Sequence, residues 1–272
     1  MNVLAIDTTG KIGSVCILKN DQKLFEKVMS EPMNHLKFLA PLIDEAIKKS
    51  QLQINDIHLI AVSRGPGSFT GIRIGVATAR AIGQSLGIPI VAVPTLKSYI
   101  FNREEPGEIC CPVFDARRNQ VYGAAYFKEK ELVSEACYMI DEYLDILYNA
   151  VNDGNFSGKV NFYGDALKFK EFIEEKFSSR EFENDDLKKN SNTGSDSVRD
   201  FKIKVSANDF KNSKKSVYEI VEGEASGTKA FSIARLGLAM FEQGNAKEYN
   251  LILPEYLRKT EAERKLEERC PQ

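Results

Sequence analysis

The sequence predicts an α/β fold that is built twice, as two lobes of related topology. In the first hundred residues, three short apolar runs precede a helical pattern and then a strand, and the same order returns near residue 108. Strands that alternate with helices form a sheet covered by helices. A repeated order of elements without repeated sequence indicates a duplicated fold. We expect an N-terminal lobe over residues 1–104 and a C-terminal lobe over residues 105–272.

The first half opens with an antiparallel meander, because three β-rich runs are separated by short polar turns. A helix follows, since Leu36, Leu39 and Ile43 recur at helical spacing. The expected elements are strands at 3–6, 14–18 and 24–29, a helix at 34–50, a strand at 58–63, a helix at 70–86, a strand at 89–93 and a helix from 95.

The second half repeats this plan and then departs from it. Its expected elements are strands at 109–114, 121–127 and 131–140, a helix at 141–151, a strand at 160–164 and helices at 165–177 and 229–243. Residues 178–216 are charged and rich in serine and asparagine, which predicts a flexible or partly ordered insertion.

Composition excludes several classes of protein. The 37 basic and 39 acidic side chains give a net charge of −2, so no overall positive charge favours nucleic acid. The start of the chain shows no basic region followed by an apolar signal segment, and no apolar run is long enough to cross a bilayer. The five cysteines lack CxxC spacing and are interpreted as reduced core thiols. We expect a cytoplasmic protein without membrane contact.

The segment GPGSFTGIRIGVATARAI, residues 65–82, is the most informative feature of the chain. Small residues recur at every fourth position from residue 71 and therefore share one helix side. Glycine inside a helix costs about 1 kcal/mol relative to alanine, so the stripe calls for close approach of another backbone. The stripe either packs inside its own lobe or faces a protein partner. The positions are Gly71, Gly75, Ala79, Gly83 and Gly87.

The loop before this helix has two interpretations. A strand, a glycine-rich loop and a helix can hold phosphate on backbone amides, but the loop has no P-loop lysine and no GxGxxG spacing. Pro66 and the glycines also fit ordinary turn chemistry, with Ser68 or Thr70 as the helix cap. Residues that could form an anion or nucleotide turn are Asp7, Thr8, Thr9, Gly65, Gly67 and Ser68.

The inventory of reactive groups argues against independent catalysis. His35 and His58 fall on different elements, so neither a zinc hydrolase nor a Ser-His-Asp triad has its usual residues. Asp7 is the best single catalytic candidate, at the end of the first strand, and Asp115 occupies the matching place in the second half. An ordinary turn explains Asp7 equally well. We assign no catalytic residue and no metal ligand.

Five segments closely resemble the bacterial TsaB family, also called YeaZ: AIDTT, NHLKFLAPLIDEAI, GPGSFTGIRIGVATARAIGQSLGIPIVAV, DARRNQVYGAAY and PEYLR. The resemblance implies a two-lobed fold of the actin, sugar kinase and Hsp70 (ASKHA) type. It also implies a role in making threonylcarbamoyladenosine at position 37 of tRNAs that read codons beginning with A. In that family the protein is a partner of a homologous catalytic subunit, TsaD. TsaE is an associated ATPase, and TsaC supplies threonylcarbamoyl adenylate.

The resemblance further implies that this chain is a non-catalytic, activating subunit. The catalytic relative carries two metal-binding histidines separated by three residues. Here His35 matches the first histidine, and Leu39 stands where the second would be. ATP and metal are therefore expected on partner subunits, with none held by this chain alone, and tRNA is met only through the complex. An ATP-binding enzyme of the same fold, a phosphotransferase or a glycoprotease-like peptidase, is the alternative.

Family members are understood to pair through their first-lobe helices, which correspond here to residues 34–50 and 70–86, and homodimers use an overlapping surface. The residues expected at this interface are His35, Leu36, Leu39, Gly71, Arg73, Gly75, Ala79 and Arg80. The sequence does not show which side of each helix faces the partner.

Overall fold

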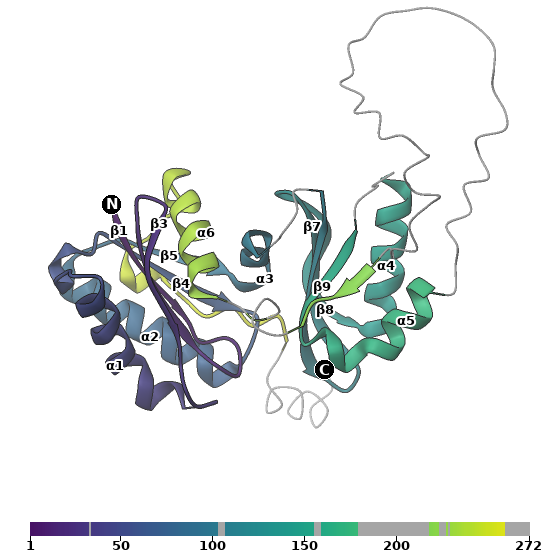
Figure 1. The fold of residues 1–272 in the computed structure, drawn as a ribbon, viewed down its shortest axis with the longest axis horizontal. Helices are drawn as coiled ribbons and strands as arrows, with labels where there is room; N and C mark the ends of the chain where they lie inside the picture. Colours follow the sequence, from purple (N-terminus) through teal and green to yellow (C-terminus); the bar gives the residue numbers. More distant parts are fainter. Residues whose placement is uncertain are drawn as a thin grey trace, which may run out of the picture.

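The computed structural model of the chain consists of two lobes side by side (Figure 1), each built on a five-stranded sheet. The structure describes residues 1–32, 34–102, 107–154, 159–178, 218–222, 227 and 229–258. The predicted insertion at 178–216 lies outside the described residues apart from Ser178, and the chain after residue 258 lies outside them as well.

Lobe 1 holds a mixed sheet in the order β3-β2-β1-β4-β5. The meander is antiparallel, whereas β1, β4 and β5 run parallel to one another. These strands confirm the predicted meander and the two predicted strands that follow it. The bounds are β1 Asn2–Asp7, β2 Ser14–Lys19, β3 Gln22–Val28, β4 Leu59–Gly65 and β5 Ile90–Pro94.

Lobe 2 repeats this plan in the order β10-β9-β6-β7-β8. Strand β6 pairs antiparallel with β7 and parallel with β9, as β1 does with β2 and β4, which confirms the predicted duplication. Strand β10 lies beyond the polar insertion and was not predicted. The bounds are β6 Ile109–Arg117, β7 Gln120–Phe127, β8 Lys130–Met139, β9 Val160–Gly164 and β10 Tyr218–Ile220.

Helices cover the outer face of each sheet (Figure 1). Helices α1, His35–Lys49, and α2, Phe69–Leu86, bury one face of the first sheet, including Leu4 and Ile6. Helices α4, Ile140–Asp153, and α5, Lys170–Ser178, bury the equivalent face of the second sheet. The helix predicted at 165–177 begins instead as a 3₁₀ turn, Ala166–Phe169, before α5.

The opposite face of each sheet is covered by a helix that follows the other sheet's strands in the chain. Helix α6, Ala230–Glu242, follows β10 in the chain but packs on the first sheet, against Val3, Ala5 and Leu59. Conversely, the short helix α3, Thr95–Ser98, and the turn after it follow β5 but pack Leu96 and Tyr99 against the second sheet. Helix α6 therefore lies on lobe 1, although the predicted boundary puts it in the C-terminal lobe.

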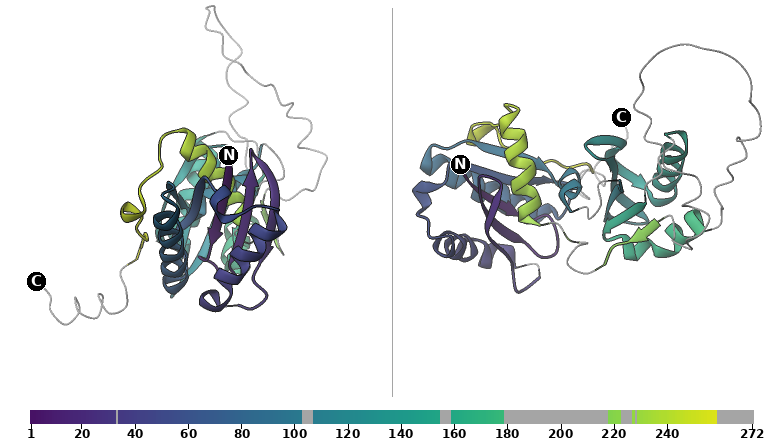
Figure 2. Two further views of the ribbon diagram at one scale, coloured as in Figure 1. Left: turned by 90° about the vertical axis from the view of Figure 1, so that its left-hand side faces the viewer. Right: turned by 45° about the horizontal axis from the view of Figure 1, so that its top comes forward.

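The C-terminal strap, residues 247–258, runs from lobe 1 to lobe 2 (Figure 1; Figure 2, right view). It begins with a backbone bridge between Lys247 and Ile90 and buries Ile252 completely against the core beneath α2. At the lobe junction the Glu255 amide donates to the Arg64 carbonyl oxygen at 2.8 Å. The Arg258 guanidinium donates to the Ala116 carbonyl oxygen on β6. One short segment therefore binds both lobes.

A partly buried acid lies at this junction. Glu135 on β8 accepts a hydrogen bond from the Tyr126 hydroxyl at 3.4 Å, and its other carboxylate oxygen has no hydrogen-bond partner in the described chain. Burial and the nearby Glu255 carboxylate raise the pKa of Glu135 to about 7, although Arg64 acts in the opposite direction. Arg64 and Glu255 form an ion pair at 2.7 Å.

The glycine stripe of α2 lies inside lobe 1. Gly71, Gly75, Ala79 and Gly83 are all buried. A Cβ atom at Gly71 would overlap the carbonyl oxygen of Thr8, and one at Gly75 would overlap the Thr8 hydroxyl. The close approach that the stripe predicted is therefore real, but its partner is the turn after β1 rather than another protein chain.

Replacing Gly71 with alanine is expected to destabilise lobe 1. The methyl group would collide with backbone at Thr8, and overpacking of this kind costs typically 1–3 kcal/mol, which exceeds the gain of about 1 kcal/mol in helix propensity. We expect Gly71→Ala to lower the thermal unfolding midpoint by several degrees. Gly107→Ala is the control, since a Cβ there meets nothing within 4 Å; equal midpoints for the two variants would contradict the packing described.

The acid at the junction predicts a pH-dependent stability. The pKa of Glu135 is raised from 4.5 to about 7 in the folded chain, so the folded state holds the proton more tightly than the unfolded state does. The stabilisation that results is complete below pH 4.5 and is lost as the pH rises through about 7. Glutamine does not ionise, so Glu135→Gln should not lose this stabilisation. Between pH 5 and 8 the free energy of unfolding of the variant should therefore rise by about 2 kcal/mol relative to that of the wild type. Unfolding curves across this range measure the difference. The control Glu129→Gln, at an exposed residue, should leave the profile unchanged, and parallel profiles for Glu135→Gln and wild type would refute the prediction.

Candidate functional site

The turn after β1 contains the predicted catalytic candidate, Asp7. Its side chain is 0% exposed at the carboxyl end of the strand. One carboxylate oxygen accepts three hydrogen bonds: from the Thr9 amide at 3.0 Å, the Thr9 hydroxyl at 2.7 Å and the Ser63 hydroxyl on β4 at 2.7 Å. The other oxygen is buried without a hydrogen-bond partner among the described residues. Asp7 therefore closes its own turn and joins β1 to β4.

The glycine-rich loop uses its amides in the same way. The Ser68 amide donates to the Thr9 carbonyl oxygen at 2.7 Å, and the Gly71 amide donates to the Ser68 hydroxyl that caps α2. The Thr8 hydroxyl donates to the Gly71 carbonyl oxygen at 2.7 Å. These polar groups of the expected anion turn serve to bind α2 to β1. This arrangement favours the turn-chemistry interpretation over a phosphate site.

The donors around His35 do not fit a metal site. His35 is 3% exposed, with one ring nitrogen 3.4 Å from the Met29 sulfur and the other 3.2 Å from the Gly10 carbonyl oxygen. Leu39, one turn later, is 2% exposed and lies in the core. Within the described ranges, no group of three or more His, Cys, Asp or Glu side chains could hold a metal ion. A two-histidine metal site cannot be built on α1.

The outer faces of α1 and α2 are the accessible part of the predicted interface. Leu36 is 81% exposed, Arg73 is exposed and Arg80 is half-buried. The other predicted interface residues are turned into lobe 1, so the expectation that they contact a partner is wrong. The cause is the helix phase, which directs the apolar and small stripes of both helices at the sheet. These buried residues are His35, Leu39, Gly71, Gly75 and Ala79.

The exposed face of α2 instead carries Phe69, Arg73, Ala77 and Ala81, at a spacing of four residues. Tyr256 of the strap extends this face. Its ring lies 4.7 Å from that of Phe69, and its hydroxyl accepts a hydrogen bond from Arg73 Nε at 2.8 Å. The Arg73 guanidinium also stacks over Phe69 at 3.8 Å.

We call Leu36, Phe69, Arg73, Ala77, Ala81 and Tyr256 the helix surface. Sequence reasoning found Leu36 and Arg73 but missed the rest. The spacing of Phe69, Ala77 and Ala81 could have revealed them, because they are the complement of the glycine stripe. Nothing in the sequence places Tyr256 beside α2, although it belongs to the PEYLR segment.

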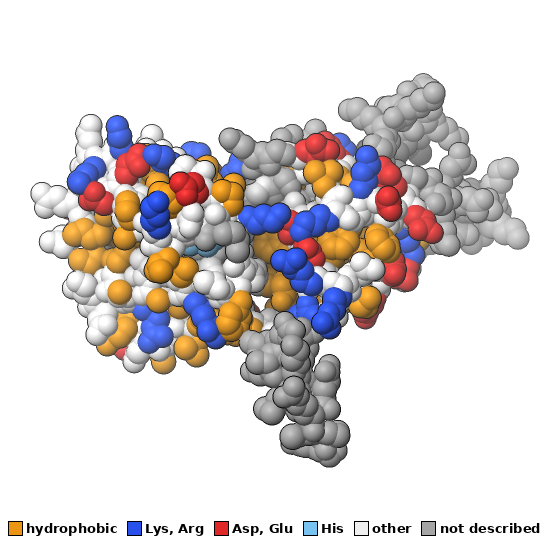
Figure 3. All heavy atoms as spheres, turned by 90° about the horizontal axis from the view of Figure 1, so that it is seen from below, with side chains coloured by type: hydrophobic (Ala, Val, Ile, Leu, Met, Phe, Trp, Pro, Cys, Tyr) orange, Lys and Arg blue, Asp and Glu red, His pale blue; other side chains and the backbone are white. Residues whose placement is uncertain are grey.

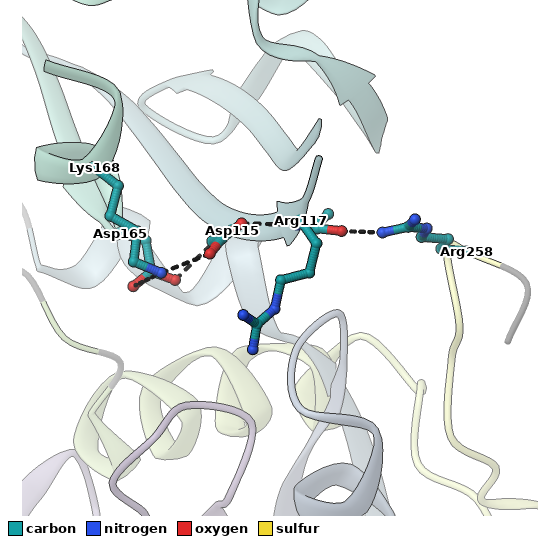
Figure 4. A network of polar contacts seen from close by, with 6 residues as sticks. Asp115, Arg117, Asp165, Lys168 and Arg258 are labelled. Carbon is teal, nitrogen blue, oxygen red and sulfur yellow. Dashed lines mark hydrogen bonds and ion pairs between the residues drawn. The ribbon is translucent and has the colours of Figure 1, made fainter. Parts of the chain in front are cut away.

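Asp115, the counterpart of Asp7 in lobe 2, is part of a different network (Figure 4). It accepts hydrogen bonds from Lys168 Nζ and from the Arg117 amide, each at 2.7 Å. Its own amide donates to Asp165 at 3.1 Å. Burial raises the pKa of the Asp115 carboxyl, but the hydrogen bonds from Lys168 and Arg117 outweigh it, and the pKa lies below its ordinary value. Asp115 therefore stays ionised and holds the turn after β6.

None of the helices in the described ranges is of the length and apolarity that a membrane span requires.

Curated relatives match about half of the chain. The chain is 33% identical to the tRNA threonylcarbamoyladenosine biosynthesis protein TsaB of Bacillus subtilis over 151 residues, which cover 54% of this chain and 66% of that protein. It is 32% identical to the Escherichia coli protein of the same name over 132 residues, covering 48% of this chain and 57% of that protein. The matched part thus spans between about half and two thirds of these relatives.

Solved structures confirm the fold. YeaZ from Pseudomonas aeruginosa matches with a TM-score of 0.64 at 18% identity, covering 94% of this chain and 99% of that chain. A protein described as similar to peptidase YeaZ from the same organism gives a TM-score of 0.66 at 20% identity, with the same coverage. Together with the duplicated sheets, these matches confirm the predicted α/β fold of two lobes with related topology.

The family model described as "TsaD: tRNA N6-adenosine threonylcarbamoyltransferase" matches residues 30–266. This match extends through both lobes and covers more of the chain than the matches to the curated relatives do. The chain therefore belongs to the TsaD family, and its relatives place it among the TsaB (YeaZ) members of that family.

Proposed function

We propose that this chain is a subunit of the machinery that makes threonylcarbamoyladenosine at adenosine 37 of tRNAs reading ANN codons. It acts by pairing with a catalytic homologue of the TsaD type. The observation that carries the proposal is the helix surface, an apolar and small-residue face on a chain that belongs to this family. This role would locate the chain in the cytoplasm, with tRNA as the substrate of the assembled complex.

The helix surface has the composition of a protein contact. Leu36 is almost fully solvated, although burying such a side chain stabilises by about 1.5–3 kcal/mol. Ala77 and Ala81 are small and exposed on α2, so a facing helix can approach it closely there. At one end, Phe69, Arg73 and Tyr256 supply the residue types that most often anchor interfaces.

A non-catalytic role is supported by the absence of usable groups on the surfaces described. Asp7 is buried and bonded within its turn, and His35 lacks a second donor at Leu39. We therefore propose that ATP and metal are held by partner subunits, with TsaE as the associated ATPase. A homodimer through the same helix surface is part of this proposal, and it would compete with the catalytic partner for one face.

A change on the helix surface should block the pairing. Ala77→Arg puts a long charged side chain in the middle of the exposed face of α2 while leaving the fold intact, because Ala77 is exposed. We expect the affinity for the catalytic homologue to fall at least about 100-fold, since an unpaired charge at an interface core costs several kcal/mol. Calorimetry measures the affinity, and a tRNA modification assay with the catalytic homologue measures the activity.

Asn149→Arg on the exposed side of α4 is the matched control, with the same new side chain on the other lobe. It should pair and activate as the wild type does. Arg80, a predicted interface residue at the edge of the surface, offers a milder test through Arg80→Glu, which should weaken pairing less. Modification that proceeds equally well without this chain would sink the proposal.

The alternative, an ATP-binding enzyme or peptidase of the same fold, makes a different prediction. Because the amides of Thr9, Ser68 and Gly71 are bonded within the lobe, calorimetry of the isolated chain with ATP and magnesium should show no tight binding. Tight binding that disappears in Asp7→Asn would favour the enzyme instead. Asp115→Asn is the matched control: it removes the equivalent negative charge in lobe 2 and should leave ATP binding unchanged.

A further inference from the structure

The turn between β6 and β7 carries arginines in an unfavourable conformation. Arg117 pairs with Gln120, so Arg118 and Asn119 form a two-residue hairpin turn. The φ angles of Arg117, Arg118 and Asn119 are 70°, 56° and 57°. Asparagine and glycine are the usual residues at such positions, and left-handed backbone costs other residues roughly 1–2 kcal/mol each. Turn chemistry therefore does not account for the two arginines.

The backbone of this hairpin is fixed from two sides (Figure 4). Asp115 accepts a hydrogen bond from the Arg117 amide and is itself held by Lys168. On the other side, the strap residue Arg258 donates to the carbonyl oxygen of Ala116. The Arg117 side chain points away from this network in the close-up view. The hairpin thus presents its side chains from a rigid base.

The two arginines are exposed, although the positive charge of Arg117 helps to lower the pKa of the Asp115 carboxyl. Among the described residues, neither guanidinium forms an ion pair with a carboxylate. Lys11, in the turn after β1 at the corresponding end of the first sheet, is exposed and also has no ion-pair partner there. Seen from below, Lys and Arg side chains gather on lobe 2 beside the lobe junction (Figure 3). This positive surface stands out in a chain whose net charge is −2.

We propose that the β6–β7 hairpin contacts the phosphate backbone of the tRNA through Arg117 and Arg118. The planar guanidinium fork matches phosphate oxygens and is always charged. Contacts to phosphate position a nucleic acid without reading its sequence, which suits a subunit that meets many tRNAs. The inference rests on the proposed function for the identity of the RNA, and adds that this chain itself supplies part of the RNA-binding surface.

The test measures tRNA binding by the full chain, alone and with the catalytic homologue, between 50 and 200 mM salt. The double variant R117A/R118A should bind about tenfold more weakly at 50 mM salt. Its slope of log affinity against log salt should be shallower by about 1.4–1.8, as expected for two lost phosphate contacts. R117K/R118K keeps the charge and should keep most of the slope. R117G/R118G removes the charge while relieving the left-handed backbone, so it separates charge loss from misfolding.

The control K19A/K130A removes two exposed charges at the opposite ends of the two sheets and should bind as the wild type does. Unchanged affinity and slope in both charge-removing hairpin variants would overturn the inference, as would an equal loss in the control. The inference would also be overturned if the wild-type chain bound no tRNA, both alone and together with the catalytic homologue. If the wild type binds tRNA but not the catalytic homologue, the proposed pairing fails while the hairpin is still tested by the chain alone.

Discussion

The close contact between α2 and the turn after β1 is the constraint on which the rest of the first lobe depends. Gly71 and Gly75 allow Thr8 to touch the helix backbone, and the Thr8 hydroxyl bonds to the Gly71 carbonyl oxygen. This contact fixes the rotation of α2 about its axis. Once the glycine side faces the sheet, Phe69, Arg73 and Ala77 must face outward. The polar groups of this turn, which could otherwise bind a phosphate, are engaged in hydrogen bonds within the lobe.

The exchange of helices makes each lobe depend on the other for its inner layer. Lobe 1 obtains α6 from beyond β10, and lobe 2 obtains α3 and Tyr99 from beyond β5. The helices that follow the strands of one sheet in the chain bury only one face of that sheet. Folding of either lobe therefore requires chain from both halves, and the lobes form a cooperative unit rather than two independent domains.

The sequence was sufficient for the elements but not for their long-range partners. Periodicity and turn residues predicted the meander, α1, α2 and the duplication, because these depend on neighbours close in the chain. The direction of the glycine stripe was missed, since two contacts, to a sheet or to a partner, satisfy the same spacing. Tyr256 beside Phe69 and α6 on the first sheet depend on contacts across much of the chain. The left-handed arginines had no sequence signal, because arginine rarely adopts that conformation.

The strap connects the two surfaces to which we assign functions. Tyr256 packs on Phe69 and Arg73 of the helix surface, whereas Arg258, two residues later, bonds to the strand that leads into the arginine hairpin. Glu255, on the other side of Tyr256, pairs with Arg64 at the lobe junction. The distance between the helix surface and the arginine hairpin is therefore set by a few consecutive residues. In our proposal, a catalytic partner bound on the helix surface would meet a tRNA whose backbone the hairpin holds at a fixed offset, and this positioning is what a non-catalytic subunit would contribute.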